Sequence, residues 1–484
     1  MTEQRDFDVL IVGAGLSGIC GAAHLEMSCP KKTYAILEAR ERLGGTWDLF
    51  RYPGIRSDSD MYTLGYSFKP WTSPKAIADG PSILAYVREA AEERGIDKKI
   101  RYRHKVIDAR WSSTDARWAL DVRVGPNDEL VTYSCRFLYI CAGYYDYDEG
   151  YTPDFPGHDA FQGRVVHPQK WTDDIAYDGK KVVVIGSGAT AVTLVPELAK
   201  RAAKVTMLQR SPTYIVSLPS TDKIAEWLRA KLPPKPAYAI NRWKNVLRSL
   251  GFYLYSRRWP DGAKKLIRAG VKRNLRGSFD VDPHFAPTYN PWDQRLCLVP
   301  DADLFEAIRN GRADVVTDHI KTFEPRGIRL KSGRLLEADL IVTATGLRLK
   351  FIGGIQVEVD GKRVETSKTL IYKGMMCSDV PNLAFAIGYT NASWTLKCDL
   401  TSAYVCRLLH HMDKNGYAMC TPRRDPSVTE EPLIDFSSGY VTRARDHLPK
   451  QGSVAPWKLR QNYAFDLYMF TRSKVDDPAM EFRA

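Results

Sequence analysis

The sequence predicts an α/β fold with two parallel-sheet domains and a helical insertion in the second domain. Two glycine-rich motifs and one basic segment indicate this. The first motif, GAGLSG at 13–18, follows the apolar run 9–12, and the second, GSGATA at 186–191, follows the apolar run 182–185. Such a motif between a strand and a helix lets the backbone approach a pyrophosphate, which the helix N-terminus attracts. Each domain is therefore predicted to be Rossmann-like and to bind a dinucleotide, and 484 residues suffice for two or three domains.

The residues after the second strand of each domain indicate which nucleotide is bound. Glu38 follows the apolar run 35–37, 20 residues after the first motif, where a carboxylate can accept hydrogen bonds from ribose hydroxyls. This favours FAD or NAD, and a glycine-rich helix start that merely packs on a sheet would not explain Glu38. The second domain has Gln209, Arg210 and Ser211 at this place and no acid, which suits a 2′-phosphate. We therefore predict FAD in the first domain and NADPH in the second. The alternative for Arg210 is an ordinary exposed arginine at a strand end.

The order of the expected elements divides the chain into five segments. The first domain should contain a strand, a helix and a strand, then a loop-rich stretch and the closing strand 137–141. A strand at 383–388 and a helix at 400–411 rejoin it near the end, and Pro and Gly residues at 153–157 mark the linker to the second domain. We expect the FAD-binding domain at 1–150 and 356–484, the NADPH-binding domain at 151–220 and 296–355, and the helical basic insertion at 221–295.

The segment 223–276 carries a positive excess as large as that of the whole chain. It has fifteen basic residues and two acidic ones, the net charge of the chain is +13, and seven aromatic residues lie in the same segment. The simplest interpretation is a helical insertion with a solvated basic face. A second is a surface that contacts anionic lipid headgroups, since Lys, Arg and Trp together suit the membrane interface. Nucleic-acid binding is not expected, because no recognised nucleic-acid module accompanies the charge.

The rest of the composition is typical of a globular protein, with 44% hydrophobic and 26% charged residues. No run reaches the roughly 18 apolar residues of a membrane span, and the flank before the apolar stretch 10–25 is not basic as in a signal peptide. Nine cysteines without CxxC spacing favour reduced thiols and a cytoplasmic location. The nine histidines form no cluster of metal ligands, so no metal is expected.

Two further motifs carry a resemblance to a known family. The segment 161–171, FQGRVVHPQKW, reads FxGxxxHxxxW, and the segment 44–58 reads GGxWxxxxYPGxxxD at every fixed position. With these motifs the chain resembles the class B flavin monooxygenases, above all those of Baeyer–Villiger type. The resemblance runs nearly end to end and is closest to a mycobacterial member of the family. Thr172 departs from the pattern, which usually has Pro or Asp at this place.

The resemblance implies an activity. NADPH reduces FAD, O₂ adds to the reduced flavin, and the oxygen adduct attacks a ketone; the resulting tetrahedral adduct rearranges to an ester, which inserts one oxygen beside the carbonyl. The implied substrates are apolar acyclic or aryl ketones, and sulfides or thioamides could also be oxidised. The nearest alternative is an N- or S-monooxygenase of the same group. A disulfide reductase would need a redox cysteine pair, and the chain has no CxxC or CxxxxC. A lipid-bound flavoprotein without NADPH turnover is the non-enzymatic alternative.

The resemblance also implies which residues act in the reaction. Arg295 matches the family's active-site arginine, which stabilises negative charge on oxygen without losing its own proton. Asp58 matches the carboxylate that positions this arginine. The alternatives are an Asx turn for Asp58 and a surface ion pair with Asp293 for Arg295. His167 is expected to be a hinge or packing residue rather than an acid or base, because it lies in an interdomain linker.

The glycine motifs and the resemblance together indicate the cofactor contacts. FAD is expected to contact Gly13, Gly15, Ser17, Gly18, Glu38, Gly45, Thr46, Trp47, Asp48, Asp58 and the backbone of Val106. NADPH is expected to contact Arg56, Ser57, Gly186, Ser187, Gly188, Ala189, Thr190, Ala191, Gln209, Arg210 and Ser211. Gln294 stands where many relatives have a lysine, so the 2′-phosphate would depend more on Arg210. The loop 390–396, with Asn391 and Trp394, is expected to line the substrate site.

Overall fold

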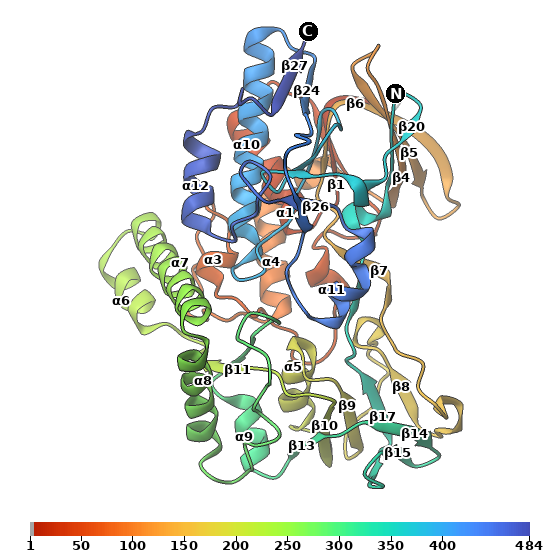
Figure 1. Cartoon of the computed structure of the whole chain (residues 1–484), viewed down its shortest axis with the longest axis vertical. Helices are drawn as coiled ribbons and strands as arrows, with labels where there is room; N and C mark the ends of the chain where they lie inside the picture. Colours follow the sequence, from red (N-terminus) through yellow and green to blue (C-terminus); the bar gives the residue numbers. More distant parts are fainter. Residues whose placement is uncertain (1–3) are drawn as a thin grey trace.

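The computed structural model describes residues 4–484 and builds them around two sheets at opposite ends of an elongated molecule (Figure 1). The upper sheet has nine strands and the lower sheet has five. Both chain ends lie in the upper half, so the chain enters the lower half and returns. The fold is the predicted α/β class with two Rossmann-like halves, and this prediction is confirmed.

The upper sheet combines a parallel core with an antiparallel meander. Its strand order is β20-β19-β4-β5-β6-β1-β2-β3, and β23 also pairs with β6. β1 pairs in parallel with β2 and β6, whereas β4, β5 and β6 pair antiparallel. The strands are β1 (Asp6–Val12), β2 (Tyr34–Glu38), β3 (Ile100–Tyr102), β4 (His104–Ser112), β5 (Arg117–Val124), β6 (Glu129–Ile140), β19 (Gln356–Val359), β20 (Lys362–Arg363) and β23 (Leu383–Phe385).

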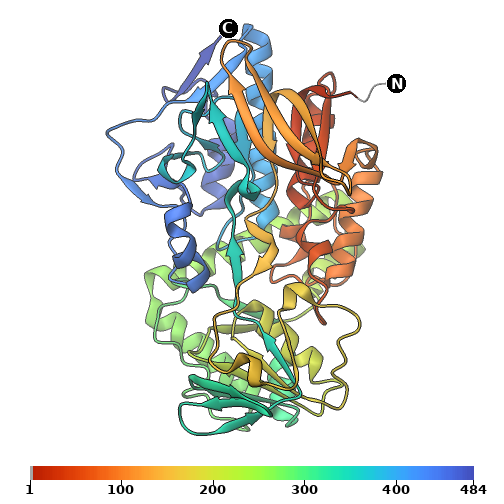
Figure 2. The same ribbon diagram turned by 90° about the vertical axis from the view of Figure 1, so that its right-hand side faces the viewer.

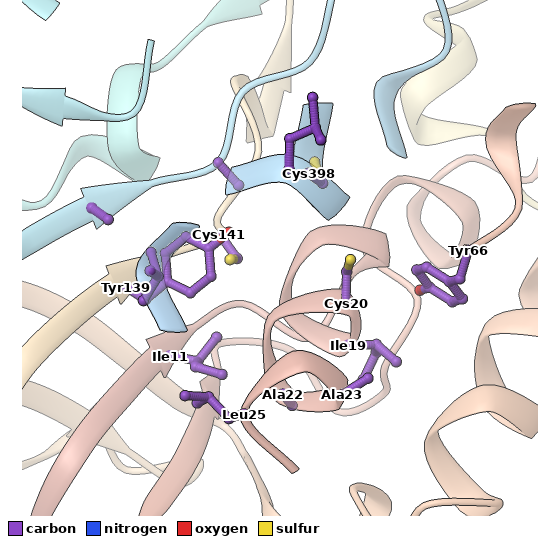
Figure 3. Close-up of a cluster of buried hydrophobic side chains, with 14 of the residues drawn as sticks. Ile11, Ile19, Cys20, Ala22, Ala23, Leu25, Tyr66, Tyr139, Cys141 and Cys398 are labelled. Atoms are coloured by element: carbon purple, nitrogen blue, oxygen red, sulfur yellow. The ribbon is translucent and has the colours of Figure 1, made fainter. Parts of the chain in front are cut away.

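Helices cover one face of the parallel strands of the upper sheet, and side chains of the meander strands β4, β5 and β6 pack against the other face. Ile11 of β1 belongs to the core under α1 (Leu16–Ser28) and α10 (Trp394–Asn415), whereas Leu10 belongs to the core under the meander. A strand buried on both faces reads as a continuous apolar run, as this one does. Figure 3 shows the helix side of this core, where Ile11 and Tyr139 lie opposite Cys20 of α1 and Cys398 of α10.

The lower sheet is entirely parallel. Its strand order is β13-β10-β9-β17-β8, and the glycine motif at 186–191 joins β9 to the helix α5. The small antiparallel sheet β14-β15-β16 lies beside it. The elements are β8 (Arg164–Val166), β9 (Lys181–Ile185), α5 (Ala189–Leu198), β10 (Lys204–Gln209), α9 (Asp303–Arg309), β13 (Ala313–Thr317), β14 (Ile320–Glu324), β15 (Gly327–Leu330), β16 (Leu335–Glu337) and β17 (Leu340–Thr343).

Two antiparallel strands connect the halves. β7 (Tyr145–Gly150) leads down from the upper sheet, and β18 (Leu347–Leu349) leads back up beside it. Figure 2 shows this pair between the two halves of the molecule. Because both crossings of the chain are joined by hydrogen bonds, the space between the sheets has a fixed wall on this side.

The basic insertion forms three helices between the parallel strands β11 (Ile215–Leu218) and β12 (Cys297–Pro300). These helices are α6 (Lys223–Lys231), α7 (Pro234–Arg258) and α8 (Pro260–Leu275). The inner face of α7 packs on the upper half, where Arg242 forms an ion pair with Asp399 of α10 at 2.9 Å. The insertion therefore spans both halves rather than extending from the lower one.

One expectation about the upper half is wrong in detail. The stretch between β2 and β6 was expected to be rich in loops, yet it holds a long helix, α4 (Gly80–Glu92), and the strands β4 and β5. The helix begins at the N-cap Asp79, whose side chain accepts a hydrogen bond from the Ser82 amide. Across residues 4–484, no helix is both long enough and apolar enough to span a bilayer.

The remaining elements are short or close the upper half. They are α2 (Thr46–Leu49), α3 (Met61–Leu64), η1 (Asp97–Lys99), η2 (His158–Ala160), η3 (Pro168–Lys170), η4 (Phe351–Gly354), η5 (Thr366–Lys368), β21 (Ile371–Tyr372), β22 (Met376–Cys377), β24 (Met419–Pro422), β25 (Glu430–Pro432), α11 (Gly439–Ala444), η6 (Arg445–His447), β26 (Lys450–Gly452), α12 (Tyr463–Arg472) and β27 (Met480–Arg483).

Candidate active site

A single cavity of about 1130 Å³ receives residues from both glycine motifs. Small-molecule sites usually occupy about 300–1,000 Å³, so this cavity has room for more than one ligand. Its walls come from the upper sheet, the lower sheet, the β7 connection and the loop before α10. The two predicted nucleotide sites therefore open into one shared space.

The first glycine motif forms a tight turn between β1 and α1. Gly13 has φ +101°, and a Cβ at this position would lie 2.7 Å from the carbonyl oxygen of Cys141. The N-cap of α1 is Gly15, which has no side chain to occupy the first amides of the helix. The amides at this helix start are therefore available to a phosphate, which the helix dipole also attracts.

Glu38 lies at the end of β2 on the cavity wall. Its carboxylate accepts hydrogen bonds from the Ala14 amide at 2.7 Å and the Arg40 amide at 2.9 Å. Burial raises the pKa of Glu38 above its ordinary value, and these two amides oppose the rise. The carboxylate is thus held beside the glycine turn, as a ribose acceptor requires.

The second glycine motif repeats this construction in the lower half. Gly186 has φ +130°, and its Cβ would lie 2.3 Å from the carbonyl oxygen of Ala344. The N-cap of α5 is Gly188, again without a side-chain cap. Arg210 follows β10 as an exposed residue on the same cavity wall. The donors around this turn suit a pyrophosphate, and the Arg210 guanidinium suits a further phosphate.

Arg295 and Asp58 meet in the cavity wall. The Arg295 Nε donates to the Asp58 Oδ2 at 2.8 Å, and Nη2 donates to the same oxygen. The two side chains are 33% and 31% exposed. The neighbouring carboxylate of Asp58 raises the pKa of Arg295, so the guanidinium stays charged. The alternative partner, Asp293, instead pairs with Arg257 at 3.0 Å, and the hydroxyl of Ser57, rather than Asp58, makes the local turn.

Aromatic side chains that the sequence reasoning missed surround this pair. Tyr144, Tyr145 and Tyr440 line the same cavity, and the Tyr144 ring stacks on Trp394 with centroids 4.9 Å apart. The Trp394 Nε1 donates to the Ser17 hydroxyl at 2.8 Å, which ties the wall to α1. Burial raises the pKa of Tyr144 and of Tyr440, so both phenols remain protonated at neutral pH. The run GYYDY directly after the Cys141 turn was the available signal for the tyrosines of β7.

Most of the expected cofactor residues lie on the cavity wall. They are Gly13, Gly15, Ser17, Glu38, Gly45, Thr46, Trp47, Arg56, Ser57, Asp58, Val106, Gly186, Ser187, Gly188, Ala189, Thr190, Arg210 and Ser211. Arg56 also pairs with Asp303 at the start of α9. The structure thus brings together residues from the segments 13–17, 38–58, 106, 186–190 and 210–211.

Four expected contact residues lie behind the wall instead. Gly18 packs against the Gly13 carbonyl, and Ala191 is buried inside α5. Asp48 is 3% exposed and pairs with three arginines, the closest being Arg40 at 2.8 Å. The Gln209 amide donates to the His284 carbonyl at 2.7 Å, so its side chain points into the lower half. These side chains support the cavity wall without facing the space inside.

His167 also lies outside this cavity wall. Its Nε2 bonds the carbonyl of Gly346 at 3.1 Å, and its Nδ1 accepts from the Gln169 amide at 3.2 Å. Burial lowers the pKa of His167. Both ring nitrogens hold backbone near the β7–β18 connection, which suits a packing role.

The buried thiols do not form a reactive pair. All nine cysteines are free and buried. Cys141 and Cys297 line the cavity, but burial raises the pKa of Cys297 to about 12 and that of Cys141 well above its ordinary value. Neither thiol supplies a thiolate at neutral pH.

Among residues 4–484, one group has side chains of the types that bind metals, namely Cys20, His24 and Asp399, whose ligand atoms lie within 4.8 Å of one another. The carboxylate already accepts hydrogen bonds from Cys20 and Arg242 and contacts His24 at 3.2 Å. These contacts account for the group as a buried hydrogen-bond network.

Two glycine turns with uncapped helix starts, a buried carboxylate beside the first turn and one shared cavity are the features expected of a flavoprotein oxidoreductase. The chain matches the model of the flavin-binding monooxygenase-like family over residues 71–225 and that of the NAD(P)-binding Rossmann-like domain over residues 11–73. It belongs to the family of FAD-containing monooxygenases, as the following relatives show.

The chain is 56% identical to the FAD-containing monooxygenase EthA of Mycobacterium tuberculosis over 484 residues, which cover 100% of this chain and 98% of the relative. It is 48% identical to the probable FAD-binding monooxygenase AlmA of an Acinetobacter species, over 99% and 97% of the two chains. Its fold resembles that of a cyclohexanone monooxygenase from Rhodococcus bound to NADP⁺, with a TM-score of 0.76, 18% identity and full coverage of both chains. The predicted family, the enzyme class and the cofactor FAD are therefore confirmed.

Proposed function

We propose that this flavin monooxygenase inserts one oxygen atom from O₂ beside the carbonyl of apolar acyclic or aryl ketones, giving esters. The observation that carries the proposal is the Arg295–Asp58 pair in the wall of the cavity that both dinucleotide turns share. A charged guanidinium held at a fixed place suits a reaction that develops negative charge on oxygen. A hydride transfer between two nucleotides would not by itself need this group.

When bound, NADPH would supply the hydride, and FAD would supply the reactivity toward O₂. The chain's residues bind and orient these groups. The turns at Gly13 and Gly186 would hold the pyrophosphates, Glu38 the adenosine ribose of FAD, and Arg210 the 2′-phosphate of NADPH.

Arg295 then acts on charge rather than by proton transfer. A guanidinium does not deprotonate in proteins, so its N–H groups stabilise an oxygen that becomes negative without giving it a proton. Asp58 holds the Nε and Nη2 edge, which leaves the remaining N–H groups for that oxygen. Asp58 is therefore a positioning residue in this proposal.

The surrounding wall fixes what can enter. Tyr144 and Tyr145 lie near Arg295, and Trp394 stacks on Tyr144, and such an aromatic wall would exclude water and accept apolar carbon chains or rings. A sulfide or thioamide would meet the same wall, so oxidation of sulfur or nitrogen is the second candidate. We also propose a cytoplasmic location, which the nine cysteines without a disulfide spacing favour.

The test is a substrate panel on the purified, FAD-loaded enzyme. Linear, cyclic and aryl ketones and one thioether are each incubated with NADPH, and both NADPH oxidation and product mass are followed. Esters one oxygen atom heavier than their ketones support the proposal. Oxidation of the thioether alone would favour the sulfur alternative, and hydrogen peroxide as the sole product with every ketone would contradict ketone oxygenation.

A further inference from the structure

The helical insertion exposes large apolar side chains where a water-facing surface would have polar ones. Of the thirteen large apolar side chains that are exposed among residues 4–484, nine lie between positions 224 and 266. Six of them define what we call the outer apolar face. These are Ile224 and Trp227 on α6 and Ile240, Trp243, Leu247 and Leu254 on α7, all between 41% and 62% exposed.

The four residues on α7 form one stripe. Their spacings of three, four and seven residues place them on a single side of a helix. The opposite side is buried against the upper half, where Arg242 pairs with Asp399 and the Asn245 amide donates to Asp60 at 3.0 Å. Since the inner side is already anchored, a rotation of α7 cannot bury the outer stripe. α6 lies alongside α7 (Figure 1), and its own apolar pair, Ile224 and Trp227, is exposed.

The outer apolar face lies within the most basic part of the chain. Segment 223–276 has fifteen basic residues and two acidic ones. Lys231 and Lys235 are exposed beside the turn that joins α6 to α7. Within the described chain, neither of these two cations has an ion-pair partner. The surface thus combines Trp, Leu and Ile with uncompensated positive charge.

We propose that the insertion docks on the surface of an anionic lipid bilayer. Apolar side chains enter the boundary between headgroups and acyl chains, while Lys and Arg contact the anionic headgroups. The helices would lie on the bilayer, since none of those at 4–484 can cross it.

The other occupants fit this surface less well. A symmetric pair of copies would bring two equally basic surfaces together, and like charges oppose such contact. A nucleic acid would satisfy the cations, but protein–nucleic acid interfaces are polar and would leave the Leu and Ile side chains unmatched.

Because of the position of α7, docking would bring the bilayer close to the wall of the cavity. Val246, on the inner side, packs with Tyr389 and Leu396, next to Ala392 and Trp394 of the cavity wall. One helix, about 10 Å across, would then separate the bilayer from this part of the wall. That apolar substrates arrive from the lipid rests on the proposed function, whereas the docking itself does not.

The test is co-sedimentation of the FAD-loaded enzyme with vesicles of phosphatidylcholine alone or mixed with phosphatidylserine. We expect binding that requires phosphatidylserine and weakens with salt, because salt screens exposed charges. The variant Lys231→Glu/Lys235→Glu should lower the partition coefficient at least about tenfold. A second variant, Trp227→Ser/Leu247→Ser/Leu254→Ser, should also weaken binding, whereas Leu130→Ser, equally exposed on β6, should not.

Three outcomes would overturn the proposal. They are failure to bind phosphatidylserine vesicles, equal binding to both vesicle types, and equal loss in the Leu130→Ser control. A dimer that the triple variant dissociates, or binding of duplex DNA without binding of vesicles, would assign the surface to another partner. Flavin content and NADPH oxidation in solution should be the same in both surface variants as in the wild type. If the triple variant does not fold, the vesicle binding of Lys231→Glu/Lys235→Glu alone tests the proposal.

Discussion

Replacing Arg295 by alanine removes the cation that Asp58 orients in the shared cavity. Two of the five guanidinium N–H groups are committed to Asp58, so three remain for other acceptors. These donors matter when an oxygen at the substrate becomes negative, and they matter little when a hydride moves between nucleotides. The variant should therefore keep flavin reduction by NADPH and lose ester formation.

The size of the effect follows from the geometry. Loss of one preorganised donor typically lowers kcat by about 10²–10³, or about 2.7–4 kcal/mol. Arg295 also carries a full charge, but its side chain is 33% exposed, so water replaces part of the lost stabilisation. We expect a loss of oxygen insertion within about 10²–10³-fold. Because Asp58 is itself 31% exposed, water can solvate its carboxylate once Arg295 is gone, so the variant should still fold, and its free energy of unfolding should be measured beside the kinetics.

Two measurements separate the steps. Anaerobic stopped-flow absorbance follows flavin reduction by NADPH, and mass spectrometry follows the ester under air. Arg326→Ala is the matched control, because Arg326 forms an ion pair with Glu337 at 2.6 Å outside the cavity wall, and it should leave both steps unchanged. Retained ester formation in Arg295→Ala would remove Arg295 from the mechanism, and equal loss of both steps would indicate damage to nucleotide binding instead.

Three further predictions concern binding and stability. If Arg210 contacts the 2′-phosphate as we propose, Arg210→Ala should raise the KM for NADPH at least about tenfold, or ~1.4 kcal/mol, and leave the KM for NADH nearly unchanged; equal rises in steady-state assays would contradict this assignment. Gly13→Ala should lower the ratio of flavin to protein in the purified enzyme, because Gly13 has φ +101° and its Cβ would lie only 2.7 Å from the carbonyl oxygen of Cys141. A full flavin complement would show that the turn tolerates the methyl group. Burial holds the pKa of His167 below 6.5 in the folded state, so the unfolded chain binds more protons and stability falls as the pH drops from 6.5 toward the lower folded value. Urea unfolding on both sides of pH 6.5 should show a smaller loss of unfolding free energy at the lower pH for His167→Gln than for the wild type. Equal losses would show that His167 does not cause this pH dependence.

The sequence predicted those parts of the site that are local in the chain. Each glycine motif and the strand before it could be predicted from a short stretch of sequence, because the tight turn, the helix start and the close approach of a phosphate all require the same few residues. Glu38 could be found by its distance from the first motif. Arg295 and Asp58 were assigned by resemblance alone, since residues 237 positions apart give no local signal that they meet.

The features that were not predicted from the sequence depend either on tertiary contacts or on the period-two alternation of apolar residues in β4 and β5. The strands β4 and β5 alternate apolar and polar side chains, as in Trp118, Leu120 and Val122, and this period-two signal was readable. By contrast, nothing in the sequence indicates that Gln209 turns away from the cavity toward His284, or that α7 packs on the upper half through Arg242. These outcomes follow from which surfaces meet after folding.

We propose that the two glycine turns, which open into one cavity, support the transfer of one atom of O₂ to a carbonyl compound. This transfer can be measured by mass spectrometry of the ester formed from an apolar ketone under ¹⁸O₂ with limiting NADPH. We expect one ¹⁸O atom in each ester molecule and one ester formed for each NADPH consumed. An unlabelled ester, or NADPH consumption matched entirely by hydrogen peroxide, would contradict it.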